Sequence, residues 1–432
     1  MTTPADTIFA LSSGAPPAAI AIMRVSGPAA FDILRGLAGR VPPPRRASVC
    51  TLRAPDTQEM LDQALALVFP GPDTATGEDL VELHLHGGRA VVRAVENAIS
   101  HFPGVRRAEA GEFTRRAFAN GRMDLNEAEG LADLLSAETE WQRRAATQMF
   151  GGAFSAAIEE YRQEVLRLSA LTEAELDFSD EGDVDSQNNV LITDGCKKLQ
   201  QQIGQLLASP PAEKLRDGLR VVLAGPPNSG KSTLLNALVG REAAIVSDIA
   251  GTTRDMIEVP VAVEGVALLF TDTAGLRDDS PDAIERIGID RSLAAMQQAD
   301  ILLWLGLEGT GPEHLHLIEI SAKNDISDYV AKSPNALSVS AQTGAGISAL
   351  LHIVAARAKT LLPPPDQFAI NARQRMLLAD AAGALAACSS SEDWLIIAEN
   401  LRQARRALDA LTGRAHTEDL LDTVFGKFCV GK

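Results

Sequence analysis

The sequence predicts a multidomain α/β protein in which a nucleotide-binding domain is inserted into a helical domain. Apolar residues recur at three- and four-residue spacing in two separate stretches, residues 124–212 and 371–424, as they do in amphipathic helices. Between these stretches, a glycine-rich phosphate-binding motif follows a strand-like apolar run. The second helical stretch has no evident partner except the first, so we expect one helical domain made of two segments. At 432 residues, the chain is long enough for two or three domains.

The first 118 residues have the pattern of a separate α+β domain. Strand-like runs cover residues 20–25 and 65–69, and residues 81–86 alternate apolar and polar side chains like a half-buried strand. Glycine and proline residues separate these runs. The predicted domains are residues 1–118 for the α+β domain, 119–214 and 371–432 for the two helical parts, and 215–370 for the nucleotide domain.

Composition and charge exclude several classes of protein. The formal net charge is −17, so the chain as a whole does not hold a nucleic-acid backbone by bulk charge. A nucleic-acid contact would need local clusters such as the arginine pairs 106–107 and 115–116, whose other interpretation is a solvated helix or loop face. The four cysteines lack the spacing of a zinc site or a disulfide framework, and neither a signal peptide nor a membrane span is evident. We expect a cytoplasmic protein.

Residues 225–232 form the motif Gly-x-x-x-x-Gly-Lys-Ser between a predicted strand and a predicted helix. Backbone N–H groups of such a loop surround the β-phosphate of a nucleotide, Lys231 reaches the β- and γ-phosphate oxygens, and the Ser232 hydroxyl ligates Mg²⁺. The N-terminus of the following helix adds partial positive charge. The predicted phosphate-binding residues are Asn228, Ser229, Gly230, Lys231, Ser232 and Thr233.

Two further segments suit the Mg²⁺ and γ-phosphate contacts of a nucleotide switch. Thr253 lies in a predicted switch loop, and its hydroxyl would complete the Mg²⁺ shell. Asp272 ends a predicted strand, where its carboxylate would hold the Mg²⁺ shell. The N–H group of Gly275, three residues on, would sense the γ-phosphate.

The segments that follow are typical of guanine recognition. Asp325, in the sequence Lys323-Asn324-Asp325, can pair with the guanine N1–H and N2–H groups. Ser340 and Ala341 begin a loop whose backbone N–H can bind guanine O6. Because these motifs occur in the order expected for Ras-like GTPases, they together predict a GTP- and Mg²⁺-binding domain.

Two positions depart from the usual GTPase pattern. Ala322 stands where the guanine box normally has Asn, and the missing amide is expected to lower nucleotide affinity by about 1–2 kcal/mol. Leu276 stands where Ras-like enzymes often have the glutamine that orients the attacking water. Another group must therefore orient this water and neutralise the developing charge, and Asn228 and the loop 247–253 are the candidates.

Several segments together carry a family resemblance. They include Asn228 and residues 247–255 of the nucleotide domain, residues 82–88 and 111–118 of the N-terminal domain, and the C-terminal residues 428–432, Phe-Cys-Val-Gly-Lys. In these segments the chain resembles the MnmE/TrmE family of tRNA-modification GTPases, and the resemblance covers essentially its whole length. It implies an N-terminal α+β folate-binding-like domain, a discontinuous all-helical domain and an inserted Ras-like P-loop GTPase domain.

The resemblance implies that K⁺ activates GTP hydrolysis when two GTPase domains approach each other. Side-chain oxygens of Asn228 and Thr252 and the carbonyl groups of Ser247 and Ile249 would ligate the K⁺. The ion would stand in for an arginine finger near the bond that breaks. Glu285 would orient the attacking water and, with Lys231 on the phosphates, would form the catalytic set.

The same resemblance implies that the N-terminal domain binds a tetrahydrofolate one-carbon derivative, in the 5-formyl or 5,10-methylene form, and dimerises the protein. Arg24, Glu82, Arg122 and Lys432 are the expected contacts, with Glu112 as a further polar candidate.

An FAD-dependent partner, called GidA or MnmG, is implied as well. With it, proteins of this family place an aminomethyl or carboxymethylaminomethyl group on C5 of the wobble uridine of tRNA. Cys429, in the C-terminal motif, is a candidate nucleophile toward C6 of uridine, or a residue that only docks near the folate. His84 and His86 have the spacing of a metal pair on one strand face, but a third ligand is not evident.

Two other functions stay open at this point. An Era-like ribosome-assembly GTPase switch would carry a basic RNA-binding module in place of this N-terminal domain and C-terminal motif. A stand-alone folate-dependent one-carbon transferase would be active without a partner.

Overall fold

The computed structural model describes residues 6–177, 186–240, 258–272, 292–325, 332, 336–365, 367–415 and 418–432. The chain forms two compact units. One joins the N-terminal part, up to Ala132, with Asp409–Lys432, and the other spans Asp133–Leu408. The four domain ranges expected from the sequence stay predictions.

The first unit is built on a six-stranded sheet with the order β3-β4-β5-β2-β1-β6. Neighbouring strands are antiparallel except β1 and β6, which are parallel. The predicted strands at 20–25, 65–69 and 81–86 are confirmed. The strands are β1 (Thr7–Leu11), β2 (Ile20–Ser26), β3 (Ser48–Arg53), β4 (Met60–Phe69), β5 (Leu80–His86) and β6 (Val105–Arg107).

Helices cover both faces of this sheet. α1 (Ala30–Ala38) and α2 (Arg89–Ser100) share one apolar core with alternate residues of the strands, including Phe9 of β1. Ile8 and Ala10, whose side chains point to the opposite face, pack against Phe113 of α3 (Glu112–Ala119). The period-two pattern of β1 thus places Phe9 in one apolar core and Ile8 and Ala10 in the other.

The C-terminal residues return to this first unit. α14 (Glu418–Phe425) packs its apolar side against Leu125 and Ala128 at the start of α4 (Leu125–Ser136). The residues after α14 run beside the start of α3, where the Phe113 N–H donates to the Lys432 carbonyl at 3.2 Å. The tail is also held at Gly431, whose carbonyl accepts from the Ser12 hydroxyl at 2.8 Å.

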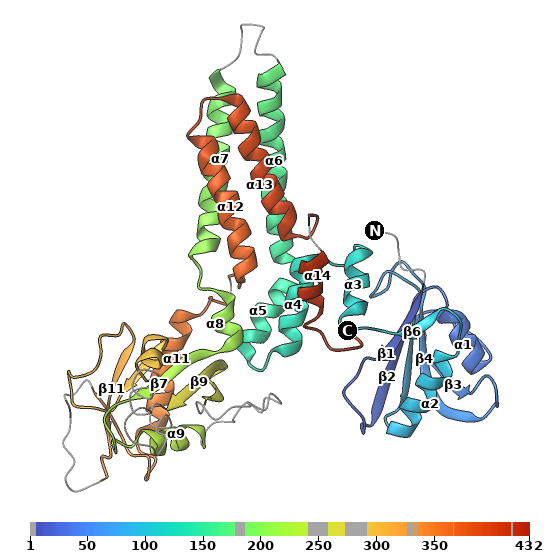
Figure 1. The fold of residues 1–432 in the computed structure, drawn as a ribbon, viewed down its shortest axis with the longest axis horizontal. Helices are drawn as coiled ribbons and strands as arrows, with labels where there is room; N and C mark the ends of the chain where they lie inside the picture. Colours follow the sequence, from blue (N-terminus) through green and yellow to red (C-terminus); the bar gives the residue numbers. More distant parts are fainter. Residues whose placement is uncertain are drawn as a thin grey trace, which may run out of the picture. The chain divides into compact units, whose positions relative to one another are not determined.

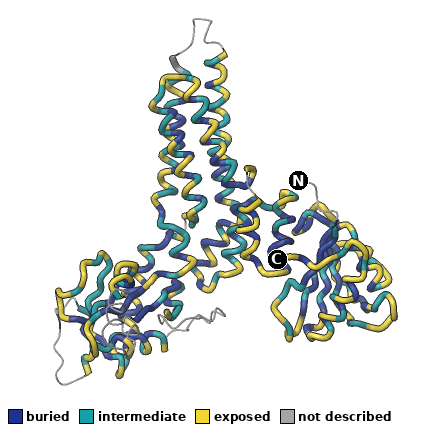
Figure 2. Tube along the Cα trace, in the orientation of Figure 1, coloured by how far each residue is buried: buried dark blue, intermediate teal, exposed yellow. Residues whose placement is uncertain are grey.

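The second unit contains a group of long helices and a second sheet (Figure 1). α7 and α12 pack against each other although the nucleotide-binding segment separates them in sequence, as expected for one helical domain made of two segments. Figure 2 shows buried residues recurring along these helices and concentrated in the strands of both sheets. The helices before and after the inserted segment are α5 (Glu140–Phe150), α6 (Ala153–Asp177), α7 (Ser186–Ala208), α8 (Ala212–Asp217), α12 (Ala372–Ser389) and α13 (Trp394–Leu411).

The sheet of the inserted segment has the order β12-β11-β10-β7-β9-β8 and is parallel except for the β8–β9 hairpin. Apolar residues of α9 (Lys231–Val239) and α11 (Ile347–Leu361) share its main core. Its strands are β7 (Leu219–Ala224), β8 (Glu258–Val263), β9 (Val266–Asp272), β10 (Ile301–Trp304), β11 (Leu317–Ala322) and β12 (Leu337–Val339). Among the helices that the structure describes, none is both long and apolar enough to cross a membrane.

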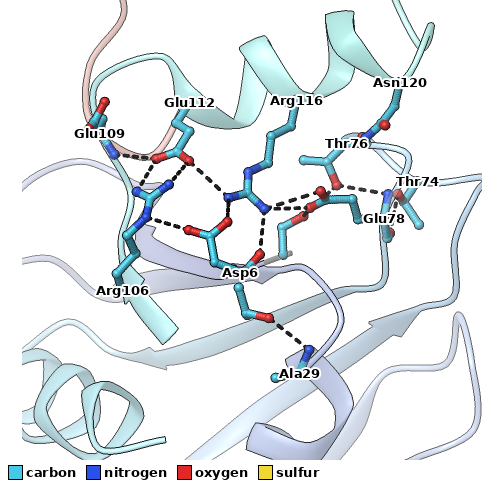
Figure 3. Close-up of polar contacts among 12 residues, drawn as sticks. Asp6, Ala29, Thr74, Thr76, Glu78, Arg106, Glu109, Glu112, Arg116 and Asn120 are labelled. Atoms are coloured by element: carbon cyan, nitrogen blue, oxygen red, sulfur yellow. Dashed lines mark hydrogen bonds and ion pairs between the residues drawn. The ribbon is translucent and has the colours of Figure 1, made fainter. Parts of the chain in front are cut away.

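A buried network of charged side chains joins distant segments of the first unit (Figure 3). Arg116 of α3, only 2% exposed, donates to Asp6 Oδ1 at 2.8 Å and to the two carboxylate oxygens of Glu78 at 3.2 and 3.3 Å. Glu112 accepts from Arg116 at 3.1 Å and from Arg106 at 2.5 and 2.8 Å. Because a buried charge is costly without its partners, the network holds α3 against the sheet.

The network lowers the pKa of two of its carboxyl groups. Burial alone would raise the pKa of Glu112, but hydrogen bonds from Arg106, the Glu109 amide and Arg116 outweigh it, so the pKa lies below its usual value. The pKa of Asp6 is lowered in the same way, because Arg106 and Arg116 outweigh its burial. Such groups stabilise the fold above their unfolded-state pKa of about 4, and this stabilisation is lost as pH falls through the lower folded-state pKa.

Replacing Glu112 should therefore destabilise the first unit. We expect Glu112→Gln to lower the free energy of unfolding at neutral pH by about 2–4 kcal/mol, because it leaves Arg116 underpaired in a buried position. The variant should also lose less stability than the parent on acidification to about pH 3, since it removes one of the titrating groups. Urea unfolding at both pH values measures these effects.

The matched control is Asp32→Asn, which breaks an exposed pair between Asp32 and Arg35 on α1. An exposed pair of this kind contributes less than about 1 kcal/mol. Equal destabilisation by the two substitutions would contradict the role given to the network.

Candidate functional site

The phosphate-binding loop lies at the carboxyl end of β7. The strand is buried because it is central in the sheet, and α9 begins at Lys231 directly after the loop. Lys231 is buried, and its Nζ donates to the carbonyl groups of Gly225 at 3.0 Å and Pro226 at 2.9 Å. The lysine thus curls over the loop, in the position from which it can reach nucleotide phosphates. Gly230 and Asn228 both have positive φ, as the tight loop requires.

The predicted Mg²⁺ ligands of the loop and the neighbouring strand meet. β7 and β9 are parallel neighbours with Leu223 opposite Asp272, so their carboxyl ends lie at the same edge of the sheet. There the Ser232 hydroxyl donates to the carboxylate of Asp272, which is buried. A hydroxyl and a carboxylate are hard oxygen donors, the type that Mg²⁺ prefers.

The guanine-recognition segments follow β11 and β12, at the same edge. Lys323 has positive φ, and its Nζ donates to the Asn228 carbonyl at 2.6 Å, which links this segment to the phosphate-binding loop. The Asn324 N–H donates to the Val339 carbonyl at 3.3 Å and joins the segment to β12. Ser340 is buried and its hydroxyl accepts from the Thr343 N–H at 3.1 Å, which closes the second loop.

The remaining members of the predicted guanine set are exposed or half-buried. Asp325 is exposed, as a ligand-contacting carboxylate can be, and Ala341 is half-buried.

Two further predicted phosphate-binding residues belong to the loop and the helix that follows it. Ser229 lies in the loop, and Thr233 lies in the first turn of α9. The other predicted residues of this site lie outside the described residues: Ser247, Ile249, Thr252, Thr253, Gly275 and Glu285.

Three of the four predicted folate contacts gather around Phe113, which sequence reasoning did not single out. Arg24 and Glu82 are cross-strand neighbours on β2 and β5 and form an ion pair at 2.7 Å. The Arg24 guanidinium lies over the Phe113 ring at 5.7 Å, and the backbone of Lys432 is bonded to Phe113. Phe113 lies inside the conspicuous segment 111–118, but its burial against β1 depends on the fold.

The other N-terminal candidates are placed differently. Arg122 donates to Asp73 at 2.8 Å, away from the Arg24–Glu82 pair. Glu112 belongs to the Arg116 network, where its carboxylate is already occupied by two arginines. Cys429 is exposed, and its carbonyl accepts from the Gly111 N–H at 3.4 Å.

The fold and the site geometry together define the class of protein. A parallel sheet carries a phosphate-binding loop, a buried Asp272 beside the loop serine, and a lysine segment linked to the loop, all at one edge. This is the arrangement of a P-loop nucleotide-binding domain, here joined to a helical domain and to an N-terminal α+β domain.

Comparisons with known proteins identify the family. A profile described as MnmE helical domain matches residues 125–429, and one described as GTP-binding protein TrmE N-terminus matches residues 7–122. The protein named tRNA modification GTPase MnmE from Erythrobacter litoralis (strain HTCC2594) is 56% identical over 99% of this chain and 100% of its own length. The protein of the same name from Novosphingobium aromaticivorans is 54% identical over 99% of this chain and 100% of its own length. The chain belongs to the MnmE family of tRNA modification GTPases.

Among solved structures, the G domain of the T. maritima FeoB iron transporter matches 32% of this chain and 98% of its own length, with 22% identity and a TM-score of 0.24.

Restoring the missing amide at position 322 should tighten nucleotide binding. We expect Ala322→Asn to lower the dissociation constant for GDP about five- to tenfold, which corresponds to one additional hydrogen bond. A fluorescent GDP analogue, titrated into the purified full chain, measures this change. Ala322→Val, which adds bulk without an amide, is the matched control. If the two variants bind GDP equally well, the amide is not what the site lacks.

Proposed function

We propose that this chain is a K⁺-activated GTPase that acts with an FAD-dependent partner of the MnmG type on tRNA. Together they install aminomethyl or carboxymethylaminomethyl groups at C5 of the wobble uridine. The observation that carries this proposal is the match over essentially the full chain to proteins named tRNA modification GTPase, combined with a complete phosphate-binding loop. The proposed assembly is a homodimer through the N-terminal domain, and the proposed location is the cytoplasm.

The residues of the loop suit GTP and Mg²⁺. Lys231 would exchange its two carbonyl acceptors for phosphate oxygens, and charge-assisted bonds of this kind are stronger than those to neutral carbonyls. Ser232 and Asp272 would hold the Mg²⁺, directly or through water. When bound, the ion neutralises charge on the transferred phosphate oxygens.

Asn228 fits the role of a K⁺ ligand. It lies in the loop before Lys231, and its positive φ turns the backbone sharply at that point. Its carbonyl is bonded to Lys323, so the backbone of Asn228 is fixed from the guanine side of the site. The other proposed K⁺ ligands are Ser247, Ile249 and Thr252, and Glu285 is proposed to orient the attacking water.

The group around Phe113 fits a tetrahydrofolate one-carbon derivative. Arg24 and Glu82 supply donors and acceptors for a pterin, and Phe113 supplies an apolar neighbour. Lys432, whose backbone carbonyl accepts from the Phe113 N–H, would supply a positive charge suited to a glutamate carboxylate. Arg122 would contribute a further positive charge.

The modification role predicts a defined change in tRNA. Deleting the gene should remove the C5-aminomethyl wobble uridines from total tRNA, and the wild-type gene should restore them. Mass spectrometry of tRNA nucleosides measures both. A gene encoding Lys231→Ala serves as a negative control, because it removes the phosphate-binding ammonium. An unchanged nucleoside profile in the deletion strain would overturn the proposed modification function while leaving the nucleotide-binding assignment intact.

Hydrolysis should depend on the monovalent cation through Asn228. GTP turnover by the purified protein is expected to be roughly tenfold or more faster in KCl than in NaCl at equal ionic strength, because a fixed positive charge stabilises the transition state. Asn228→Ala should abolish the difference between the two salts. Asn236→Ala, on the exposed side of α9, is the control and should retain it. If Asn228→Ala keeps the full response to K⁺, the side chain of Asn228 is not a ligand.

A further inference from the structure

The first unit contains a cavity whose lining residues differ from the group around Phe113. A cavity of about 560 Å³ is lined by residues of α3 and α14 and by Arg106 of β6. Its volume lies within the usual range for small-molecule pockets, about 300–1,000 Å³. We refer to it as the α3–α14 cavity.

Aromatic and aliphatic side chains line one part of the α3–α14 cavity. The rings of Phe118 and Phe425 lie there with their centroids 6.0 Å apart and their planes tilted by 49°. Phe425 and Leu421 of α14 are almost completely buried in this part of the lining. The accessible apolar surface therefore comes from the half-buried Phe118 and the exposed Ala119 at the end of α3. Surfaces of this kind bind flat rings by stacking and apolar contact.

The polar part of the cavity offers both donors and acceptors. Arg115 donates to Glu418 at 2.6 Å and to Asp422 at 2.9 Å, which uses only part of the five N–H groups of a guanidinium. Glu109, which precedes α3, is exposed and adds a carboxylate to the lining. A ligand with its own donors and acceptors could therefore bond to both Arg115 and Glu109.

The charge of the lining argues against an anion. Four carboxylates and three guanidiniums line the cavity, so their formal charges sum to −1. A phosphate or a carboxylate ligand would meet this excess of negative charge, whereas a neutral ring would not. The favoured ligand is thus a flat, uncharged heterocycle that carries both donors and acceptors.

Two lining residues of the cavity belong to the buried ion network. They are Arg116 and Glu112, and the network ties α3 to Asp6, Glu78 and Arg106 (Figure 3). Because the network fixes α3 against the sheet, the α3 part of the lining is in place before any ligand arrives.

The C-terminal segment connects this cavity to the proposed folate contacts. Phe425 and Gly426 line the cavity, and six residues later the Lys432 backbone is bonded to Phe113. The exposed Cys429 lies between these two points, and its neighbour Val430 bridges to Ala110, another lining residue. The α3–α14 cavity and the Phe113 group therefore share one short segment of chain.

We propose that the α3–α14 cavity receives an uncharged pyrimidine base extruded from the anticodon loop of a substrate RNA. The proposal rests on the proposed modification function, which requires the base to leave its stack before its C5 can be reached. Phe118 would contact the ring, Glu109 would accept from its N3–H, and Arg115 would donate to a carbonyl oxygen. The pterin of a folate has the same chemistry and is the other source of such a ring.

Filling the cavity tests the proposal. Ala119→Phe places a ring at an exposed position of the lining and leaves the Arg116 network untouched. Two anticodon stem-loop RNAs serve as probes, one with uridine at the wobble position and one abasic there. By fluorescence anisotropy, the parent full chain should bind the uridine RNA about tenfold more tightly than the abasic RNA, since a stacked base contributes about this much. Ala119→Phe should bind both RNAs with the affinity of the abasic one.

Two further variants make the result specific. Glu109→Ala removes an exposed carboxylate, and it should reduce the preference for uridine even if Ala119→Phe proves unstable. Ala156→Phe, at an exposed alanine of α6 in the other unit, should keep the full preference. A parent protein without preference, or a preference that survives both cavity variants, would overturn the proposal.

A folate titration distinguishes the two sources of the ring. 5-Formyltetrahydrofolate should bind Ala119→Phe as tightly as the parent. Loss of folate binding with RNA discrimination intact would assign the cavity to the pterin and overturn the proposal.

The failure of this inference can be told apart from failure of the proposed function. If the deletion strain loses its modified uridines and the Ala119→Phe gene restores them fully, the cavity assignment is wrong and the modification function stands. If the deletion leaves tRNA nucleosides unchanged, the modification function is wrong, whatever the RNA-binding result.

Discussion

The buried guanidinium of Arg116 is the constraint on which the N-terminal unit depends. A charge in this position must find partners, and it finds them in Asp6 before β1, Glu78 before β5 and Glu112 one turn earlier on α3. These segments are far apart in sequence, so the pairing fixes the position of α3 relative to the sheet. α3 in turn packs Phe113 against the sheet and contributes residues to the lining of the α3–α14 cavity. The C-terminal tail is hydrogen-bonded to its first turn.

In the second unit, the corresponding constraint is that the two chain connections between the helical domain and the inserted domain must lie next to each other. Arg375, at the start of α12, donates to the Leu207 and Ser209 carbonyls at 2.6 and 2.8 Å. The Ala212 N–H donates to the Ile370 carbonyl at 3.1 Å. The two connections of the nucleotide domain are therefore bonded side by side, close to the packed pair α7 and α12. A domain attached through adjacent termini can be inserted without disturbing its host.

Features formed by residues close together in the sequence could be predicted. The phosphate-binding loop, its strand and its helix lie within about twenty residues, and each element has its own pattern. The ion network could not be predicted, because its members come from residues 6, 78, 106, 112 and 116. The pair Arg115-Arg116 suits a solvated helix face, but successive residues on a helix point about 100° apart. Arg115 consequently reaches the exposed ion pairs with α14, whereas Arg116 is buried. The hydrogen bond from Lys323 to the Asn228 carbonyl could not be predicted either, because it depends on the left-handed backbone conformation at Lys323.

The steric role of the glycine in the C-terminal motif becomes evident only in the folded structure. Gly431 has a φ of 96°, and a Cβ built there would lie 2.1 Å from the Leu11 carbonyl oxygen. A Cβ on Gly111 would lie 2.2 Å from the Phe425 carbonyl oxygen. Any side chain at either position would push the tail away from β1 or from α3. These two glycines therefore let the backbone around Cys429 lie against the start of α3, while its side chain stays exposed. The glycine of the C-terminal motif thus places the cysteine and the terminal lysine, whatever chemistry those two side chains perform.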